Sequence, residues 1–224
     1  MNLEEIIKLL EENGTEDNIK SSKRFDIRFK KAYGVKLPIL RKIAKQTGKN
    51  HKLAQELWEY NAHETRLLAT MIDEPEQVTN QQLNEWVSSF DSWDIVDQAC
   101  INLFDKVPQA IENIFIWYKA EEEFTKRTAF SLIAIIAVHN KKAPASIFDK
   151  YYPLIIEAST DNRNFVKKSI SWALRSIGKR DKQSNKNALK CAYELQKLDN
   201  KTSNWIARDV IRELESEKVQ NKIK

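Results

Sequence analysis

The chain has 224 residues, of which 42% are hydrophobic and 31% charged, and this indicates a globular protein with a substantial core. Four glycines and five prolines leave few turn residues for hairpins, so an all-helical fold is favoured. Two cysteines exclude a disulfide framework and a cysteine-rich zinc site, and they indicate buried free thiols in a reducing compartment. The N-terminal stretch is acidic and no apolar run has membrane-spanning length, so we expect a cytoplasmic protein without a signal peptide or a membrane span.

Apolar residues recur at helical spacing along the chain, and the breaks carry glycine, proline and capping residues. In chain order the pattern predicts helices over residues 2–12, 17–32, 38–47, 51–60, 63–72, 79–88, 92–105, 107–119, 124–139, 144–158, 162–177, 184–197 and 202–216. Short helices with short loops are typical of HEAT-like units, whose helix pairs bury their apolar faces only by stacking. We therefore expect an all-α solenoid, a superhelical stack of antiparallel helix pairs with a concave face. A compact irregular bundle is the alternative. No linker divides the chain, so residues 1–224 are expected to form one domain.

The net charge of +5 is distributed unevenly along the chain. Residues 20–52 contain 12 Lys and Arg and one Asp, a local charge of +11, and residues 163–190 contain nine Lys and Arg and one Asp, a local charge of +8. Residues 53–123 carry a local charge of −12. In a curved molecule the two basic segments could form one positive surface, which suits a polyanion such as nucleic acid. Two separate solvated helix faces are the alternative.

The stretch SFDSWDIVDQAC, residues 89–100, places an aromatic residue and carboxylates at the start of an expected helix. At 100° per residue, Trp93 and Asp97 lie one turn apart at the edge of the apolar arc, whereas Asp94 and Gln98 point to the opposite side. Asp94 is then an ordinary first-turn acid facing the helix dipole. Asp97 is expected to be half-buried beside an aromatic ring and to need a partner. A salt bridge or a cap to a neighbouring helix would satisfy it without any catalytic role.

A second group of residues lies on the helix expected over 162–177, where Lys168, Trp172, Arg175 and Lys179 follow one another at spacings of four, three and four. They form a stripe on the polar side, and a Trp among cations is unusual there. Trp172 could simply stack on Arg175 as a cation–π pair. It could equally offer its ring to a sugar or a base while the cations contact phosphates.

Arg127 stands in the first turns of an otherwise uncharged, buried helix, where the helix dipole disfavours a cation. It needs an anion, and the candidates are Asp97, another acidic side chain or a phosphate; a buried Arg–Asp pair is the purely structural interpretation. His63 and Glu64 lack a second His at metal-protease spacing, and we expect no metal and no cofactor. If the protein is an enzyme, it works with a carboxylate, aromatic rings and cations.

Several stretches resemble one family in the right order over nearly the whole chain. They are YGVKLPILRKIAK (33–45), HETRLLA (63–69), FDSWDIVDQ (90–98), KRTAF (126–130) and FVKKSISWALRSIGK (165–179). The chain thus resembles the AlkD-type DNA alkylation repair proteins, which are DNA glycosylases built from HEAT-like repeats. The W-x-x-x-D and V-x-K-A/S-I-x-W-x-L-R elements are fairly specific together, and neither is strong alone.

The resemblance implies a basic concave face for duplex DNA and the excision of positively charged N3- and N7-alkylated purines by hydrolysis of the N-glycosidic bond, without base flipping. The family's catalytic Asp matches Asp97, its two sugar-contacting Trp residues match Trp93 and Trp172, and its active-site Arg matches Arg127. The expected DNA contacts are Lys36, Arg41, Arg163, Lys168, Arg175 and Lys179. Such a protein is expected to be a monomer that associates with the nucleoid when it acts on DNA.

The family also contains paralogues without detected glycosylase activity. Ser92 stands where some members have a second Trp, and the first 19 residues carry a local charge of −5, which does not suit a DNA cradle at the N-terminus. A catalytically inactive helical-repeat protein that binds nucleic acid, or a protein-interaction module that uses the acidic segment 53–123, is therefore the alternative function.

Overall fold

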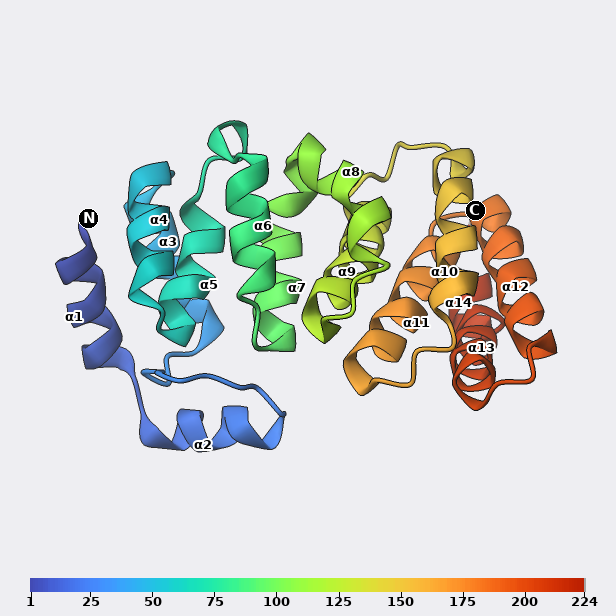
Figure 1. The fold of residues 1–224 in the computed structure, drawn as a ribbon, viewed down its shortest axis with the longest axis horizontal. Coiled ribbons are helices and arrows are strands. Elements are labelled where there is room, and N and C mark those ends of the chain that lie inside the picture. Colours follow the sequence, from blue (N-terminus) through green and yellow to red (C-terminus); the bar gives the residue numbers. More distant parts are fainter. Residues whose placement is uncertain (224) are drawn as a thin grey trace. The chain divides into compact units, whose positions relative to one another are not determined.

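The computed structural model describes residues 1–223, which form fourteen α-helices and three 3-10 helices and, over that range, no β-strand. The helices follow one another in Figure 1 in chain order. They are α1 (Leu3–Asn13), α2 (Glu16–Arg24), α3 (Leu37–Thr47), α4 (His51–Tyr60), α5 (His63–Ile72), η1 (Pro75–Gln77), α6 (Asn80–Ser88), α7 (Trp93–Asn102), η2 (Phe104–Lys106), α8 (Pro108–Trp117), α9 (Glu123–His139), η3 (Ala145–Tyr151), α10 (Tyr152–Ala158), α11 (Asn164–Gly178), α12 (Lys182–Lys197), α13 (Lys201–Leu214) and α14 (Glu217–Gln220). The expected all-helical fold is confirmed.

Most helices begin and end within two residues of the positions expected from the sequence, but three expected helices are interrupted or shortened. The helix expected over 17–32 is wrong beyond Arg24, because residues 25–36 form an irregular segment instead. The helix expected over 92–105 stops at Asn102 and is followed by η2. The helix expected over 144–158 is divided into η3 and α10, and a proline lies in the first turn of α10.

The chain forms two compact units, Met1–Ala110 and Ile111–Lys224, and the boundary between them falls inside α8. In unit 1 the central helix is α5, which packs against α3, α4 and α7. Only two residues join α4 to α5, and the first of them, Asn61, takes a left-handed conformation with φ of 58° that ends α4. The rings of Trp58 and Trp86 stack in the core with their centroids 3.9 Å apart.

In unit 2 the main packing is between α9 and α11, and α11 also packs against α12 and α13. Every residue of α9 from Arg127 to Ala137 is buried, as the uncharged stretch predicts. Gly178 lets α11 approach α13 closely, because a Cβ atom there would lie 2.3 Å from a methyl carbon of Leu214. Cys100 and Cys191 are both buried free thiols, as expected, and burial raises the pKa of Cys191 to about 12.

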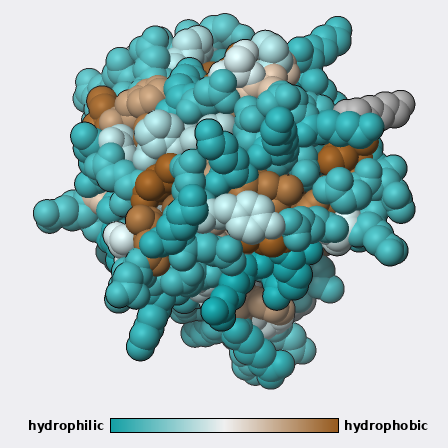
Figure 2. Space-filling view, turned by 90° about the vertical axis from the view of Figure 1, so that its right-hand side faces the viewer, coloured by the Kyte–Doolittle hydropathy of each residue, from teal (hydrophilic) through white to brown (hydrophobic). Residues whose placement is uncertain are grey.

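The surface that faces the viewer in Figure 2 is mostly hydrophilic, and its hydrophobic patches are small and separated by polar side chains. Tyr193 and Trp205 are among the exposed large hydrophobic residues of unit 2. Isolated apolar residues of this kind are normal on a protein surface and do not define an apolar interface. Within residues 1–223 we find no helix with the length and apolar character needed to span a membrane.

Candidate active site and nucleic-acid interface

The first two turns of α7 carry the two residues that the sequence placed together. Trp93 is the first residue of the helix and Asp97 lies one turn later, and both side chains are half-buried. The indole Nε1 of Trp93 donates a hydrogen bond to the backbone carbonyl of Phe25, at 3.0 Å. Phe25 belongs to the irregular segment after α2 and is largely exposed. This hydrogen bond fastens the irregular segment after α2, which follows several basic residues, to Trp93.

Asp94 does more than compensate the helix dipole, so the expectation that it faces away from the core is wrong. Its Oδ2 lies 2.9 Å from Nε2 of His63, and its side chain is only 16% exposed. The hydroxyl of Ser92 donates to Oδ1 of Asp94 at 2.5 Å and accepts a weaker hydrogen bond from the backbone N–H of Arg28 at 3.4 Å. Asp94 therefore joins the start of α7 to α5 and to the irregular segment.

In this buried pair, each residue shifts the pKa of the other in the direction that favours the charged form. Burial would lower the pKa of His63, but the hydrogen bond to Asp94 and the charges of Asp94 and Glu64 outweigh it, so the pKa lies above 6.5. Burial would likewise raise the pKa of Asp94, but the hydrogen bond and charge of His63 hold it below 3.8. Each member of the pair therefore favours the charged form of the other.

The other charged residues of the HETRLLA stretch also fix loops around α7. Glu64 accepts hydrogen bonds from the backbone N–H groups of Tyr33, Gly34 and Val35 at 2.9, 2.7 and 3.1 Å, which anchors the end of the irregular segment. Arg66 donates to Asp91 and to the carbonyl of Ser89, both at 2.8 Å. Sequence reasoning found no role for these residues. The sequence does show that three charged side chains lie in the first turn of this helix. The structure adds that nearly every residue of the helix is buried.

In unit 2 Arg127 is buried in the second turn of α9, as expected, with 6% of the residue exposed. Its Nη1 donates to the carbonyl oxygen of Phe165 at 2.8 Å, so it fixes the start of α11. Nearby, Arg163 and Lys126 both form ion pairs with Asp161. Burial alone would raise the pKa of Asp161, but the hydrogen bonds from Arg163 and Lys126 hold it at about 2.

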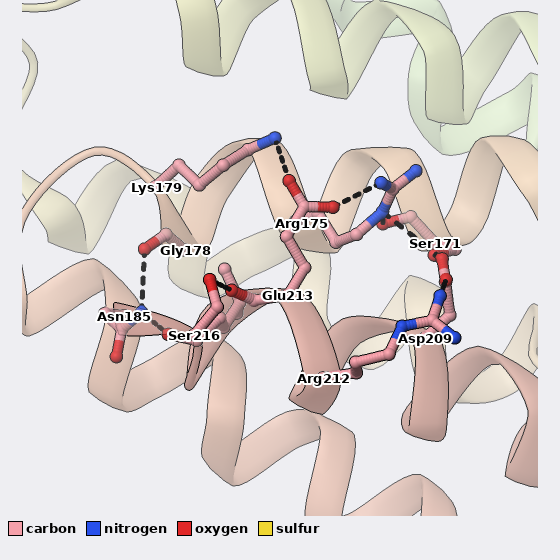
Figure 3. A network of polar contacts seen from close by, with 10 residues as sticks. Ser171, Arg175, Gly178, Lys179, Asn185, Asp209, Arg212, Glu213 and Ser216 are labelled. Atoms are coloured by element: carbon pink, nitrogen blue, oxygen red, sulfur yellow. Dashed lines mark hydrogen bonds and ion pairs between the residues drawn. The ribbon is translucent and has the colours of Figure 1, made fainter. Parts of the chain in front are cut away.

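Two of the three cations of the α11 stripe, Arg175 and Lys179, are held by acidic residues of α13, as Figure 3 shows. Arg175 forms ion pairs with Glu213 and with Asp209, the latter at 3.4 Å. Lys179 binds the other carboxylate oxygen of Glu213 at 2.7 Å. Burial would raise the pKa of Glu213, but the two cations outweigh it and lower that pKa. The signal that sequence reasoning missed is the spacing of four between Asp209 and Glu213, which places both on one face of a helix.

The remaining expected contacts differ in their surroundings. Trp172 is half-buried and lines a cavity with Lys179. Lys168 on α11 is exposed, as are Lys36, which precedes α3, and Arg41 within it. Trp93 and Asp97 belong to unit 1, and Arg127 and Trp172 to unit 2. The convergence of these four residues on one surface stays a prediction, as do the roles of the expected DNA contacts.

The comparisons with known proteins identify the family. Residues 6–214 match the family described as DNA alkylation repair enzyme, and the chain belongs to this family. A relative, the uncharacterized protein Lin0241 of Listeria innocua, is 28% identical over 103 residues, which cover 45% of this chain and 46% of the relative. The chain thus aligns with less than half the length of that relative.

A solved structure has the same fold with a TM-score of 0.78 at 17% identity, and the match covers 95% of each chain. It is described as a new family of proteins related to the HEAT-like repeat DNA glycosylases, with affinity for branched DNA structures. The expected HEAT-like fold and the resemblance to DNA alkylation repair proteins are confirmed. Among the described residues no three His, Cys, Asp or Glu side chains are grouped so that they could hold a metal ion.

Proposed function

We propose that the protein is a DNA glycosylase that excises positively charged N3- and N7-alkylated purines, such as 3-methyladenine and 7-methylguanine, from duplex DNA. The observation that carries the proposal is the pair Trp93 and Asp97, one turn apart at the start of α7, with Trp93 fastened to the backbone of a basic segment. An aromatic face and a carboxylate side by side suit a reaction that develops positive charge on a sugar.

The chemistry follows from the charge of the substrate. An alkylated purine that already carries a positive charge leaves as a neutral base when the N-glycosidic bond breaks, so the leaving group needs no acid. The sugar becomes an oxocarbenium-like cation. Asp97 stabilises this cation electrostatically and positions a water molecule. The water adds to the anomeric carbon and releases a proton, which leaves an abasic site.

The other site residues support this reaction in the proposal. Trp93 and Trp172 offer their ring faces to the deoxyribose. The partial negative charge on the face of an aromatic ring stabilises the developing cation. Arg127 and the exposed cations Lys36, Arg41 and Lys168 bind phosphates, together with Arg163, Arg175 and Lys179. The damaged base is excised without being flipped into a pocket, so selectivity comes from the positive charge of the lesion and not from its shape.

The direct test is incubation of the protein with methylated duplex DNA, followed by chromatography of the released bases. The expected result is release of 7-methylguanine and 3-methyladenine by the unaltered protein and very slow release by the Asp97→Asn variant. Equal release by both proteins would exclude Asp97 from the reaction. No release by the unaltered protein would exclude the glycosylase proposal.

A second candidate function is DNA binding without excision. One observation favours it: the chain shares its fold with a protein family whose description names DNA binding and not excision. The structural neighbour related to the glycosylases has affinity for branched DNA. A protein of this kind would bind branched DNA but release no alkylated base from methylated duplex DNA, so the release assay on the unaltered protein separates the two functions.

A further inference from the structure

Unit 2 contains a cavity of about 410 Å³ at the C-terminal ends of α9 and α11. It is lined by Ala137, Val138, Lys141, Trp172, Ser176, Lys179 and Arg180. Pockets for small ligands have volumes from about 300 to 1,000 Å³, so the space is sufficient for one ligand of modest size. The lining residues, and not the volume, indicate which kind of ligand fits.

The lining divides into an apolar part and a cationic part. Trp172, Ala137 and Val138 are apolar, and the small side chains of Ala137 and Ser176 leave room for a flat group beside the indole. Three cations complete the lining: Lys141, Lys179 and Arg180. A ligand that matches both parts has a flat aromatic group and a negative charge, as a nucleoside phosphate does.

Arg180 is a fixed part of the cavity. Its Nη1 and Nη2 donate to the backbone carbonyls of Ala137 and Ala143 at 2.5 and 2.7 Å, and its guanidinium lies 4.6 Å from the ring centre of Phe148. The C-terminal end of a helix such as α9 repels anions, because its last carbonyls carry partial negative charge. Arg180 covers one of these carbonyls and brings a full positive charge, so the end of α9 becomes able to accept an anion.

The positive charge of the cavity is only partly neutralised. Lys179 is paired with Glu213 at 2.7 Å. Lys141 is exposed at the edge of the cavity, and its ammonium has no ion-pair partner in the part of the chain that the structure describes. Arg180 is bound by carbonyl groups, which do not cancel its charge. The cavity therefore has a surplus of positive charge that a phosphate would balance.

We propose that this cavity binds one unpaired nucleotide of DNA, with its base against Trp172 and its phosphate against Lys141 and Arg180. The positions of residues along α11 support a DNA strand, and not a free nucleotide, as the source of the ligand. Lys168 is exposed one turn before Trp172 and could contact the next phosphate of the strand. The nucleotide need not be the damaged one: in unmodified DNA the ring of Trp172 meets this base in place of the deoxyribose of a lesion. The inference rests on the proposed function only in naming DNA as the source of the nucleotide, and it does not depend on excision.

The test is fluorescence anisotropy with two unmodified duplexes, one fully paired and one with a single bulged nucleotide. Stacking of one base on an aromatic side chain corresponds to a gain of about fivefold or more in affinity, so the bulged duplex should bind at least that much tighter. The variant Lys141→Glu should bring the ratio of the two affinities close to one. The matched control Lys142→Glu, whose residue is exposed and next in sequence but outside the cavity lining, should lower both affinities and keep the ratio.

Equal affinity of the unaltered protein for both duplexes would overturn the proposal, and so would an equal loss of the ratio in both variants. A second variant, Ser176→Leu, fills the cavity without changing charge and should also remove the preference if its melting temperature shows that it folds. Binding of free deoxynucleoside monophosphate separates the two sources: binding at micromolar concentrations by a protein that shows no preference for the bulged duplex would assign the cavity to a free nucleotide and refute DNA as the source. Release of alkylpurine from paired DNA should be equal in Lys141→Glu and Lys142→Glu, so failure of the excision proposal is measured independently.

Discussion

The start of α7 in unit 1 and the α11 stripe in unit 2 use charged residues in opposite ways. At the start of α7 the buried charges hold the loops in place: His63 pairs with Asp94, Glu64 accepts from backbone N–H groups and Arg66 donates to Asp91. Asp97 lies beside Trp93 on the same helix. In the α11 stripe two of the three cations that sequence reasoning assigned to DNA, Arg175 and Lys179, are themselves paired, with Glu213 and Asp209. A charged residue near a candidate site can therefore either stabilise the structure of the site or bind the ligand. The partners of its side chain in the structure distinguish these two roles.

The largest expected effect concerns Asp97, to which the proposal gives a catalytic role, in contrast to the structural role of Asp94 on the same helix. The variant Asp97→Asn should slow single-turnover release of 7-methylguanine by about two to three orders of magnitude, the range seen when one preorganised stabilising group is lost. DNA binding should persist, because loss of a carboxylate removes a repulsion for phosphates. A folded variant that excises at the unaltered rate would show that Asp97 has no catalytic role.

The matched change Asp94→Asn should have the opposite phenotype. It leaves His63 buried without its charged partner, so the free energy of unfolding should fall by about 1–3 kcal/mol. Excision below the melting temperature should remain near that of the unaltered protein. Urea denaturation and the single-turnover assay measure the two effects, and an Asp94→Asn variant that is stable but inactive would contradict the division of roles between these carboxylates.

The α11 stripe gives the next effect. Replacement of Lys168, Arg175 and Lys179 by alanine should weaken binding to duplex DNA of any sequence by roughly tenfold or more and should flatten the salt dependence, by about 0.9 in slope for each phosphate that is no longer neutralised. The variant Glu213→Gln sharpens the test, because it releases Arg175 and Lys179 and should increase both the affinity and the slope. Unchanged binding in both variants would show that this stripe does not bind DNA.

The smallest effect is a pH dependence of stability that unit 1 should show. Because the pKa of His63 is raised in the folded protein, its interaction with Asp94 stabilises the fold fully below pH 6.5. This stabilisation is lost as the pH rises through the raised pKa. The lowered pKa of Asp94 stabilises the fold above pH 3.8 and loses its effect as the pH falls. The pair therefore contributes fully between pH 3.8 and pH 6.5, and stability should decline above the upper value and below the lower value by at most about 1.4 kcal/mol per pH unit for each group.

The variant His63→Gln should lose the alkaline part of this dependence, and His139→Gln, in which the replaced histidine is exposed at the end of α9, serves as the control. The measurement is urea denaturation at a series of pH values from about 5 to about 9, a range that spans the ordinary pKa of histidine. An alkaline slope that is the same in both variants would mean that the His63–Asp94 pair does not govern it.

The all-helical fold could be predicted from the sequence because helical periodicity and capping residues are local. The bounds of α4 and α5 were predicted to the residue, since Asn50 caps the first and a two-residue break separates them. The irregular segment 25–36 could not be predicted in this way. Its backbone groups bind Glu64 and Trp93, which lie about 30 to 70 residues further along the chain, and such partners leave no local pattern.

The candidate site shows the same limit. The adjacency of Trp93 and Asp97 follows from helix geometry alone, so it could be predicted from sequence. The placement of Asp94 could not, because helical spacing gives a direction around α7 but not the position of α5, from which His63 reaches it. The pairing of Arg175 with Glu213 likewise joins α11 to α13, and the charge of each segment taken alone gave no sign of it.

The hydrogen bond from Trp93 to the carbonyl oxygen of Phe25 has a consequence for how this protein can vary in evolution. The acceptor is a main-chain atom, so the identity of the side chain at position 25 is not selected by this interaction, and substitutions there are tolerated as far as Trp93 is concerned. The path of the main chain is selected instead, between the end of α2 and the three N–H groups held by Glu64. Relatives that keep the Trp should therefore tolerate substitutions in this segment far better than insertions or deletions.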